Sequence, residues 1–249
     1  MKGFTGWLLA AALAIPWASA QTLLELSAGR PSLDAQALVV ERGLGTEVDF
    51  TEDLGMEQDT VALGRLTHWG RRGFVCLAWE QASFAGDEVV QRTIYYSGKP
   101  YRVGTRVKSE LAMERGVLQA AWQFLATPGG RVAFGPMVEV VGLRARGQLD
   151  APQATPPVSE SGTFQAVAPV PGLALDLRPG ARVRLFARAA GLRLSQGSYD
   201  SGEVGVVLGP FGPLALAGGY RLLNVRVEDE PDFVRLRLDG PYLSVALAF

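Results

Sequence analysis

Apolar and polar side chains alternate in steps of two through residues 213–249, on both sides of the polar segment 228–232. Antiparallel pairing about this segment places Leu214 opposite Leu247 and Val225 opposite Leu236, and directly paired residues point to the same side of a sheet. One face is then apolar near the chain end and charged near the segment, while the other face changes in the opposite sense. An apolar band followed by charge on the same face is typical of a tilted strand that crosses a bilayer and continues into water.

The same change of face recurs along the chain, in the stretches 59–69, 74–85, 106–124, 131–149, 164–178 and 181–196. We therefore expect an all-β protein, a transmembrane antiparallel up-and-down β-barrel of about ten strands, with eight or twelve as alternatives. Short turns are expected at one end, in the periplasm, at residues 71–72, 128–129, 179–180 and 210–212. Longer external loops are expected at the other end, at residues 43–58, 86–103, 150–162, 197–200 and 228–232.

Residues 1–20 have the features of a cleaved signal peptide, with Lys2 at the start, an apolar stretch over 7–15 and the small residues Ala18-Ser19-Ala20 at its end. The apolar stretch is too short for a spanning helix. Residues 21–249 are then a single barrel domain in the bacterial outer membrane. We expect outer-membrane lipids and the barrel-assembly machinery as partners, with Tyr242 and the terminal aromatic Phe249 as the membrane-insertion signal.

Polar and charged residues take the inward positions of the strands at the height of the apolar band. This predicted lumen network contains Arg65, Glu80, Gln119, Glu139, Asp176, Arg182, Arg184, Arg188, Glu203 and Arg221. An isolated buried ion is prohibitively costly, so these charges have to pair and be hydrogen-bonded. The network is either a salt-bridged plug that fills a small barrel or a path for protons or small ions.

Above the band the inward positions become apolar. The predicted apolar lining contains Leu63, Leu111, Met113, Val141, Leu143, Leu192, Leu194, Leu223, Val225, Leu236 and Leu238. Two interpretations stay open. External loops fold in and fill this space through Phe50, Leu54, Met56, Ile94, Tyr95 and Tyr96, or the space is a pocket for a small apolar molecule or lipid chain.

Composition speaks against several other functions. The 24 basic and 25 acidic residues give a net charge of −1, which offers no electrostatic footprint for nucleic acid. Cys76 is the single cysteine, so an intramolecular disulfide or a Cys-rich metal site is excluded. His68 is the single histidine and falls on the outward side beside a short turn, so we expect no enzyme. The acidic segment 47–53 matches no defined metal loop, and neither a metal nor a cofactor is expected.

The signal segment, the alternating strands and Phe249 together resemble Gram-negative outer-membrane β-barrels. The segments LGTEVDF (44–50), DLGM (53–56) and GTRVKSE (104–110) resemble those of an uncharacterised proteobacterial outer-membrane barrel family. The resemblance covers roughly residues 40–150 and implies fold and location only. A looser architectural likeness links the chain to the outer membrane protein W family, barrels associated with the passage of hydrophobic compounds.

These observations favour a monomeric, non-enzymatic barrel that binds small hydrophobic molecules or passes them across the outer membrane. The alternative is a structural or surface-interaction barrel with a plugged lumen and no transport. A continuous cavity in the upper lumen would favour the first hypothesis, whereas packing by residues 43–58 and 86–103 would favour the second.

Overall fold

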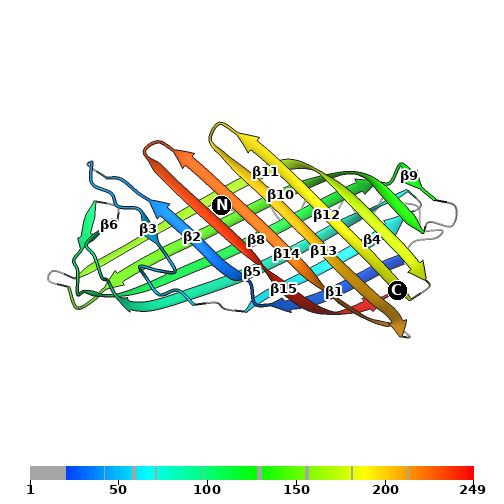
Figure 1. The fold of residues 1–249 in the computed structure, drawn as a ribbon, viewed down its shortest axis with the longest axis horizontal. Helices are drawn as coiled ribbons and strands as arrows, with labels where there is room; N and C mark the ends of the chain where they lie inside the picture. The colour runs from blue at the N-terminus through cyan, green and yellow to red at the C-terminus, as the bar shows by residue number, and fades with distance from the viewer. Residues whose placement is uncertain are drawn as a thin grey trace, which may run out of the picture.

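The computed structural model describes residues 21–249 except 42, 58–59, 71, 97, 128–130, 155–156, 181 and 212. The predicted signal peptide, residues 1–20, lies outside the described residues. Among those described, none belongs to a helix long and apolar enough to cross a membrane. The chain forms an elongated, tilted barrel of antiparallel strands (Figure 1).

Ten strands form the closed wall of the barrel within the described residues, counting β1 and its continuation β2 as one strand. In order around the wall these are β1 (Gln21–Gly29) with β2 (Ser32–Leu38), β4 (Val61–Gly70), β5 (Gly73–Val89), β8 (Arg106–Trp122), β10 (Val132–Ala151), β11 (Val158–Gly180), β12 (Val183–Leu194), β13 (Gly197–Phe211), β14 (Leu214–Asp229) and β15 (Asp232–Ala248). Strand β15 pairs with β1 and closes the barrel. Short strands accompany them: β3 (Val48–Asp49), β6 (Ile94–Tyr96), β7 (Lys99–Tyr101) and β9 (Leu125–Ala126).

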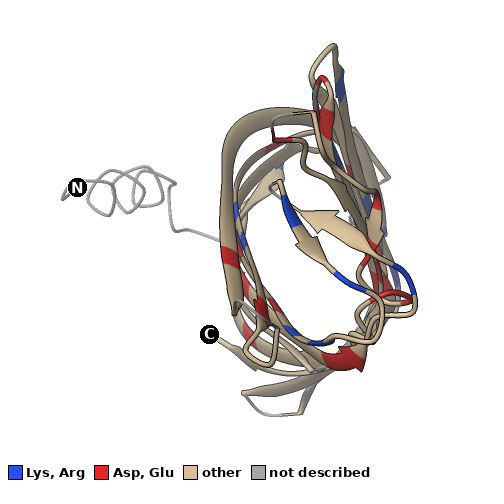
Figure 2. Cartoon of the chain, turned by 90° about the vertical axis from the view of Figure 1, so that its left-hand side faces the viewer, with Lys and Arg blue, Asp and Glu red and all other residues tan. Residues whose placement is uncertain are grey.

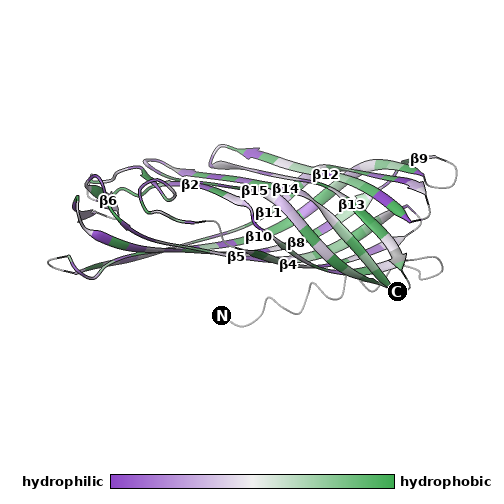
Figure 3. Cartoon of the chain, turned by 60° about the horizontal axis from the view of Figure 1, so that its bottom comes forward, coloured by the Kyte–Doolittle hydropathy of each residue, from purple (hydrophilic) through white to green (hydrophobic). Residues whose placement is uncertain are grey.

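The predicted fold class and the register of the last hairpin are confirmed. Leu214 pairs with Leu247 and Val225 with Leu236, as the alternation requires. The outward side chains of this hairpin, including Leu243 and Val245, are exposed, whereas inward Tyr242 is buried. The apolar residues that cover the outside of the wall form a belt, which Figure 3 shows in green over the strands near the C-terminal end.

Several strands are much longer than a membrane requires. A tilted strand crosses a bilayer in about 9–11 residues, whereas β10 has 20 residues and β11 has 23. About half of β10 and of β11 therefore extends beyond the apolar belt. Below, the end of the barrel with β9 and the chain terminus is called the short-turn end, and the end with β3, β6 and β7 is called the long-loop end.

Three of the predicted long loops are shorter than expected, because the strands continue into them. Residues 197–200 lie in β13, most of the segment 228–232 lies in β14 and β15, and β10 and β11 take up both ends of the segment 150–162. At the tips of these strands, above the apolar core of the upper lumen, both faces of a strand meet polar surroundings, so the alternation disappears although the backbone pairing continues. The predicted turn at 179–180 is also shifted, since β11 continues to Gly180.

Above the belt the wall separates at two places. Pairing between β11 and β12 stops at Gly172 and Ala190, although β11 extends to Val158. Pairing between β1 and β4 stops at Gly29 and Val61. Above this level β2 continues the line of β1 and β5 continues to Val89, but β2 and β5 do not pair with each other. These openings are called the β11/β12 seam and the β2/β5 seam.

The segment 48–57 bridges the β2/β5 seam. On one side the N–H of Phe50 donates to the carbonyl oxygen of Ala35, at 2.9 Å, and on the other the N–H of Glu57 donates to that of Ala85, at 3.3 Å. The buried side chains of Phe50, Leu54 and Met56 are thereby held inside the mouth of the barrel.

The close approach of two strands makes Gly135 a sensitive position. A Cβ atom on Gly135 would lie 1.8 Å from the backbone oxygen of Trp122, whereas one on Gly147, in the same strand, would meet nothing within 4 Å. We predict that Gly135→Ala strongly reduces the yield of folded, heat-modifiable barrel after refolding into detergent, and that Gly147→Ala refolds like the unaltered protein. Equal yields for the two variants would contradict the register of β8 on β10.

Candidate functional site in the lumen and its mouth

Within the described residues, the part of the lumen inside the apolar belt holds balanced charges. Five arginines and five carboxylates point inward and are buried or half-buried there: Arg65, Arg115, Arg184, Arg188, Arg221, Glu25, Glu80, Glu139, Asp176 and Glu203. Equal numbers of the two signs allow mutual neutralisation where solvation by bulk water is weak.

Glu203 on β13 is the centre of one cluster. Both of its carboxylate oxygens accept hydrogen bonds from Nη2 of Arg65, each at 2.8 Å. Arg221 donates to the same carboxylate at 3.2 Å, and the Tyr242 hydroxyl donates to it at 2.7 Å. The Arg221 guanidinium also lies 3.8 Å from the centre of the Tyr242 ring. Four elements, β4, β13, β14 and β15, are thus tied together across the lumen.

Glu139 on β10 is the centre of a second cluster and only 1% exposed. Its carboxylate accepts hydrogen bonds from Gln119 at 2.8 Å, from the Tyr199 hydroxyl at 2.5 Å and from the Ser201 hydroxyl at 3.3 Å. Arg115 forms an ion pair with Glu80 at 2.8 Å. It also donates a 3.3 Å hydrogen bond to the Tyr199 hydroxyl oxygen, which connects this ion pair to the Glu139 cluster.

A third cluster lies nearer the short-turn end. Asp176 accepts hydrogen bonds from Arg184, at 2.9 Å from Nε, and from Gln123, at 2.7 Å. The Arg184 guanidinium stacks on the Trp69 ring at 3.9 Å. Planar guanidinium groups are well suited to pair with carboxylates and to cover aromatic faces at the same time. A space of about 120 Å³ remains beside Trp69 and Arg184 at this level.

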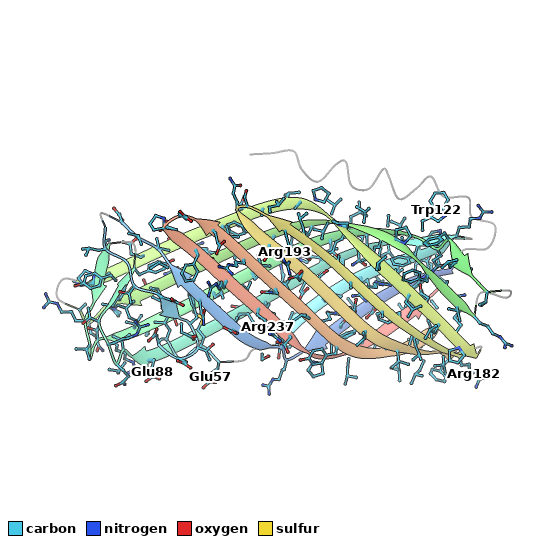
Figure 4. All side chains as sticks on the ribbon, turned by 45° about the horizontal axis from the view of Figure 1, so that its top comes forward. Glu57, Glu88, Trp122, Arg182, Arg193 and Arg237 are labelled. Atoms are coloured by element: carbon cyan, nitrogen blue, oxygen red, sulfur yellow. The ribbon has the colours of Figure 1, made fainter. Side chains whose placement is uncertain are left out.

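Nine of the ten predicted network residues lie together in the lumen, and Arg182 does not. Arg182 precedes β12 and is exposed at the short-turn end (Figure 4). In the sequence, Arg182 has the spacing of the inward residues Arg184 and Arg188. Because β12 begins only at Val183, the alternation of the strand does not determine where the Arg182 side chain points. Tyr242, expected to act with Phe249 in membrane insertion, points into the lumen, while Phe249 is exposed at the chain end.

Sequence reasoning missed Arg115 and Glu25. Arg115 has the same parity as Gln119 on β8, and Glu25 lies between the outward residues Leu24 and Leu26. The alternation used for the other strands was therefore sufficient to identify both residues.

A small cavity lies where the charged part of the lumen meets the apolar part. Its volume is about 60 Å³, and its lining includes Leu63, Glu139, Arg188 and Leu223. A water molecule occupies about 30 Å³ of liquid, so the cavity has room for about two. This volume is far below the several hundred Å³ of a typical ligand pocket.

Loop side chains fill the upper lumen. Phe50, Leu54, Met56 and Ile94 are buried, as the loop-filling interpretation requires, while Tyr95 and Tyr96 are half-buried. Most of them pack into one apolar core with the inward residues of the strands. Seen end-on in Figure 2, the β6–β7 hairpin lies across the long-loop end of the barrel.

Most of the predicted apolar lining belongs to this core or packs against it. Nine of its residues are buried: Leu63, Leu111, Met113, Val141, Leu143, Leu223, Val225, Leu236 and Leu238. Leu192 is half-buried. Leu194 is 64% exposed, which corrects its assignment to the lining, because it lies at the tip of the β12–β13 hairpin above the packed core.

Polar contacts fasten the filling segments to the wall. Lys99 of the β6–β7 hairpin forms an ion pair with Glu160 of β11, and the Tyr101 hydroxyl donates to the carbonyl oxygen of Leu149 at 3.3 Å. On the other segment, Asp53 accepts a 2.9 Å hydrogen bond from Nε of Arg92. Burial opposes ionisation of Asp53, but its hydrogen bonds with Arg92 and the Asp49 backbone outweigh burial and hold its pKa below the usual value.

His68 and the acidic segment 47–53 form no recognisable reaction centre. His68 faces outward near the short-turn end, where its Nδ1 lies 3.0 Å from the Thr22 hydroxyl. Asp49 accepts hydrogen bonds from the backbone N–H groups of Thr51 and Glu52, both at 2.9 Å. Across the described part of the chain, no three His, Cys, Asp or Glu side chains come close enough to hold a metal ion.

Two further hollows are open grooves formed mainly by outward residues of the wall. One, of about 1000 Å³, is lined by residues that include Leu185, Val206 and Leu243. The other, of about 550 Å³, is lined by residues that include Phe134 and Leu173. Both are grooves of the apolar belt.

No family model and no curated protein matches the chain. Among solved structures, the chain is similar to the outer membrane protease OmpT from Escherichia coli, with a TM-score of 0.57 and 10% identity over 92% of this chain and 97% of that chain. It is also matched with the attachment invasion locus protein Ail of Yersinia pestis (TM-score 0.40, 9% identity, 93% of this chain, 99% of that chain). A third match is the toluene transporter TbuX of Ralstonia pickettii (0.40, 9%, 94% and 90%). The likeness to OmpT shows the barrel fold.

Removal of the Glu203 carboxylate leaves Arg65 and Arg221 without their shared partner. We predict that Glu203→Ala lowers the free energy of unfolding by about 3–5 kcal/mol, as for other broken buried ion pairs, measured by urea unfolding in vesicles. Asp87→Ala, which removes the exposed partner of Arg106, serves as the control and should change stability little. Similar losses in both variants would contradict the central role of Glu203.

The Asp53 contact should make the attachment of segment 48–57 dependent on pH. Because the folded-state pKa of Asp53 is lowered, its stabilising contribution is present above the unfolded-state pKa of about 3.9 and is lost as pH falls through the folded-state value. We predict that Asp53→Asn lowers the thermal midpoint at pH 7 and that the difference from the unaltered protein shrinks as the pH falls toward about 3. A difference that stays constant over this range would contradict the assignment.

Proposed function

We propose that the chain is an outer-membrane barrel with a sealed lumen, whose long-loop end is extracellular and acts as an interaction surface. The apolar belt and the barrel fold shared with OmpT support the location. The single observation that carries the closed state is the small size of the lumen spaces, about 60 Å³ between the ion-pair clusters and the apolar core and about 120 Å³ near the short-turn end. The long strands and the filled mouth support an ordered surface beyond the lipid.

Passage of hydrophobic molecules, the leading hypothesis from sequence, has less support. Passage needs a continuous apolar path, but the apolar residues of the upper lumen pack against Phe50, Leu54 and Ile94, and charged clusters lie below them. The open grooves of the belt support contact with acyl chains of outer-membrane lipids rather than transport.

The proposal also includes the absence of catalysis. OmpT is a protease, but a 10% identical neighbour carries no activity over to this chain. His68 contacts Thr22 at the end of the barrel opposite the β6–β7 hairpin. At the mouth, Asp53 is already paired with Arg92, which makes its carboxylate a weak general base.

Planar-bilayer recordings and liposome uptake test the seal. The refolded barrel should give no conductance steps and no uptake of an apolar dye, because its lumen is filled. The double variant Arg65→Ala/Glu203→Ala removes two large side chains beside the cavity without changing the net charge, and it should produce measurable conductance. Asp87→Ala/Arg106→Ala removes an exposed pair and should stay silent.

Heat-modifiable migration of each preparation verifies that the barrel has folded and inserted. Steady conductance or dye uptake by the unaltered protein would contradict a sealed barrel and favour passage.

A further inference from the structure

The upper part of β11 forms a free sheet edge. Residues 158–171 pair with β10 on one side. On the other side they have no partner, because the pairing of β11 with β12 ends at Gly172. The β2/β5 seam is bridged by backbone hydrogen bonds of segment 48–57. Among the described residues, no backbone hydrogen bond bridges the β11/β12 seam in the same way.

The register defines which backbone groups face the seam. The N–H of Arg178 donates to the carbonyl oxygen of Arg131 at 2.7 Å, and the register from Leu177 to Val158 is unbroken. In an antiparallel ladder, alternate residues direct N–H and C=O to opposite neighbours. Even-numbered residues of β11 therefore bond to β10, and odd-numbered residues point toward the seam.

Two prolines explain where the pairing with β12 ends. Pro169 and Pro171 are odd-numbered, so their nitrogens point toward β12 and have no hydrogen to donate. Each would have to supply a ladder bond if β12 continued along β11. The neighbouring odd residue below them, Leu173, pairs with Ala189, and the ladder stops one position above it.

Beyond the prolines the edge regains complete donors and acceptors. Ser159, Ser161, Thr163, Gln165 and Val167 each direct one N–H and one C=O to the seam, and all five side chains are exposed. None of the five is charged. The acidic Glu160, on the inward side, is already paired with Lys99. Natural edge strands are commonly protected by lysine, proline or a covering loop, and residues 159–167 have none of these on the seam side.

We propose that residues 159–167 of β11 dock an extended polypeptide segment of a partner, which adds to the sheet as a new strand. This rests on the proposed surface-interaction function and names the partner's chemistry. Only an extended backbone complements five alternating N–H and C=O pairs. The fitting segment has about nine residues and no charge, with Ser or Thr beside the outward row of β11 and apolar side chains beside Phe164 and Ala166.

The prolines also set the lower limit of the docking site. A partner strand loses its backbone partners at Pro169 and Pro171, so it cannot extend down the seam into the apolar belt. A second copy of this chain in the same membrane fits less well, because both copies point the same way and their β11 edges then run in the same direction. The added strand is therefore assigned to another polypeptide.

Hydrogen exchange of the refolded full chain tests the free edge without any partner. The amides of Ser161, Thr163 and Gln165 should exchange rapidly, and those of Gly162 and Phe164 slowly, because only the even-numbered amides bond to β10. Uniform slow exchange across 159–167 would overturn the proposal. This result does not depend on conductance, so failure of the docking site and failure of the sealed lumen are distinguishable.

The binding probe is a synthetic nine-residue peptide of alternating Thr and Val, measured by fluorescence anisotropy. Thr163→Pro removes the central seam-facing N–H without removing a bond to β10, and it should weaken binding by about tenfold or more. Thr163→Ala keeps the N–H and should bind like the unaltered protein.

Two N-methylated forms of the peptide identify the edge that docks. Methylation of alternate amides on one edge should abolish binding, and methylation on the other edge should leave it intact. Equal binding of both forms, equal binding to the Pro and Ala variants, or dimerisation of the barrel through this edge would overturn the proposal.

Discussion

The rest of the structure depends on the requirement that no backbone N–H or C=O remains unpaired where lipid surrounds the wall. Within the apolar belt each strand has a partner on both sides, and β15 closes on β1. Above the belt water removes this requirement, and the wall separates where β11 leaves β12 and where β5 extends past β4. The position of both seams above the belt follows from the change of solvent.

The side chains that fill the lumen also differ between the level surrounded by lipid and the level surrounded by water. Inside the belt the outer face of the wall is apolar, and polar inward side chains satisfy one another in clusters centred on Glu203, Glu139 and Asp176. Above the belt the outer face is wet, and the inward face becomes an apolar core that Phe50 and Leu54 complete. The barrel thus has the side-chain distribution of a membrane protein at one end and that of a soluble β-protein at the other. Along the long strands, the apolar face changes from the outer side to the inner side between the two ends.

This inversion explains how much of the structure the sequence predicts. Wherever one face is apolar, a shift of one residue would reverse every side chain, so alternation fixes the register of pairs such as Val225 and Leu236. The direction is lost where a strand ends, as for Arg182 and Leu194, and strand length is lost where both faces are polar, as at 197–200. The seams were not predicted, because alternation reports the faces of a strand and says nothing about its neighbours.

Pro169 and Pro171 nevertheless carried a signal about the neighbour. A proline in a strand is compatible only with a side that needs no N–H, and two at the same parity mark one side of β11 as unpaired over that stretch. The same reasoning applies to Pro136 of β10. Its partner on β11 is the odd-numbered Leu173, so the nitrogen of Pro136 points toward β8, and the pairing of β8 with β10 accordingly begins at Met137. Alternation thus identifies which face of a strand is inward, and the positions of the prolines identify which edge of the strand lacks a partner. In β11 the prolines mark the border between the closed wall within the lipid and the free edge above it.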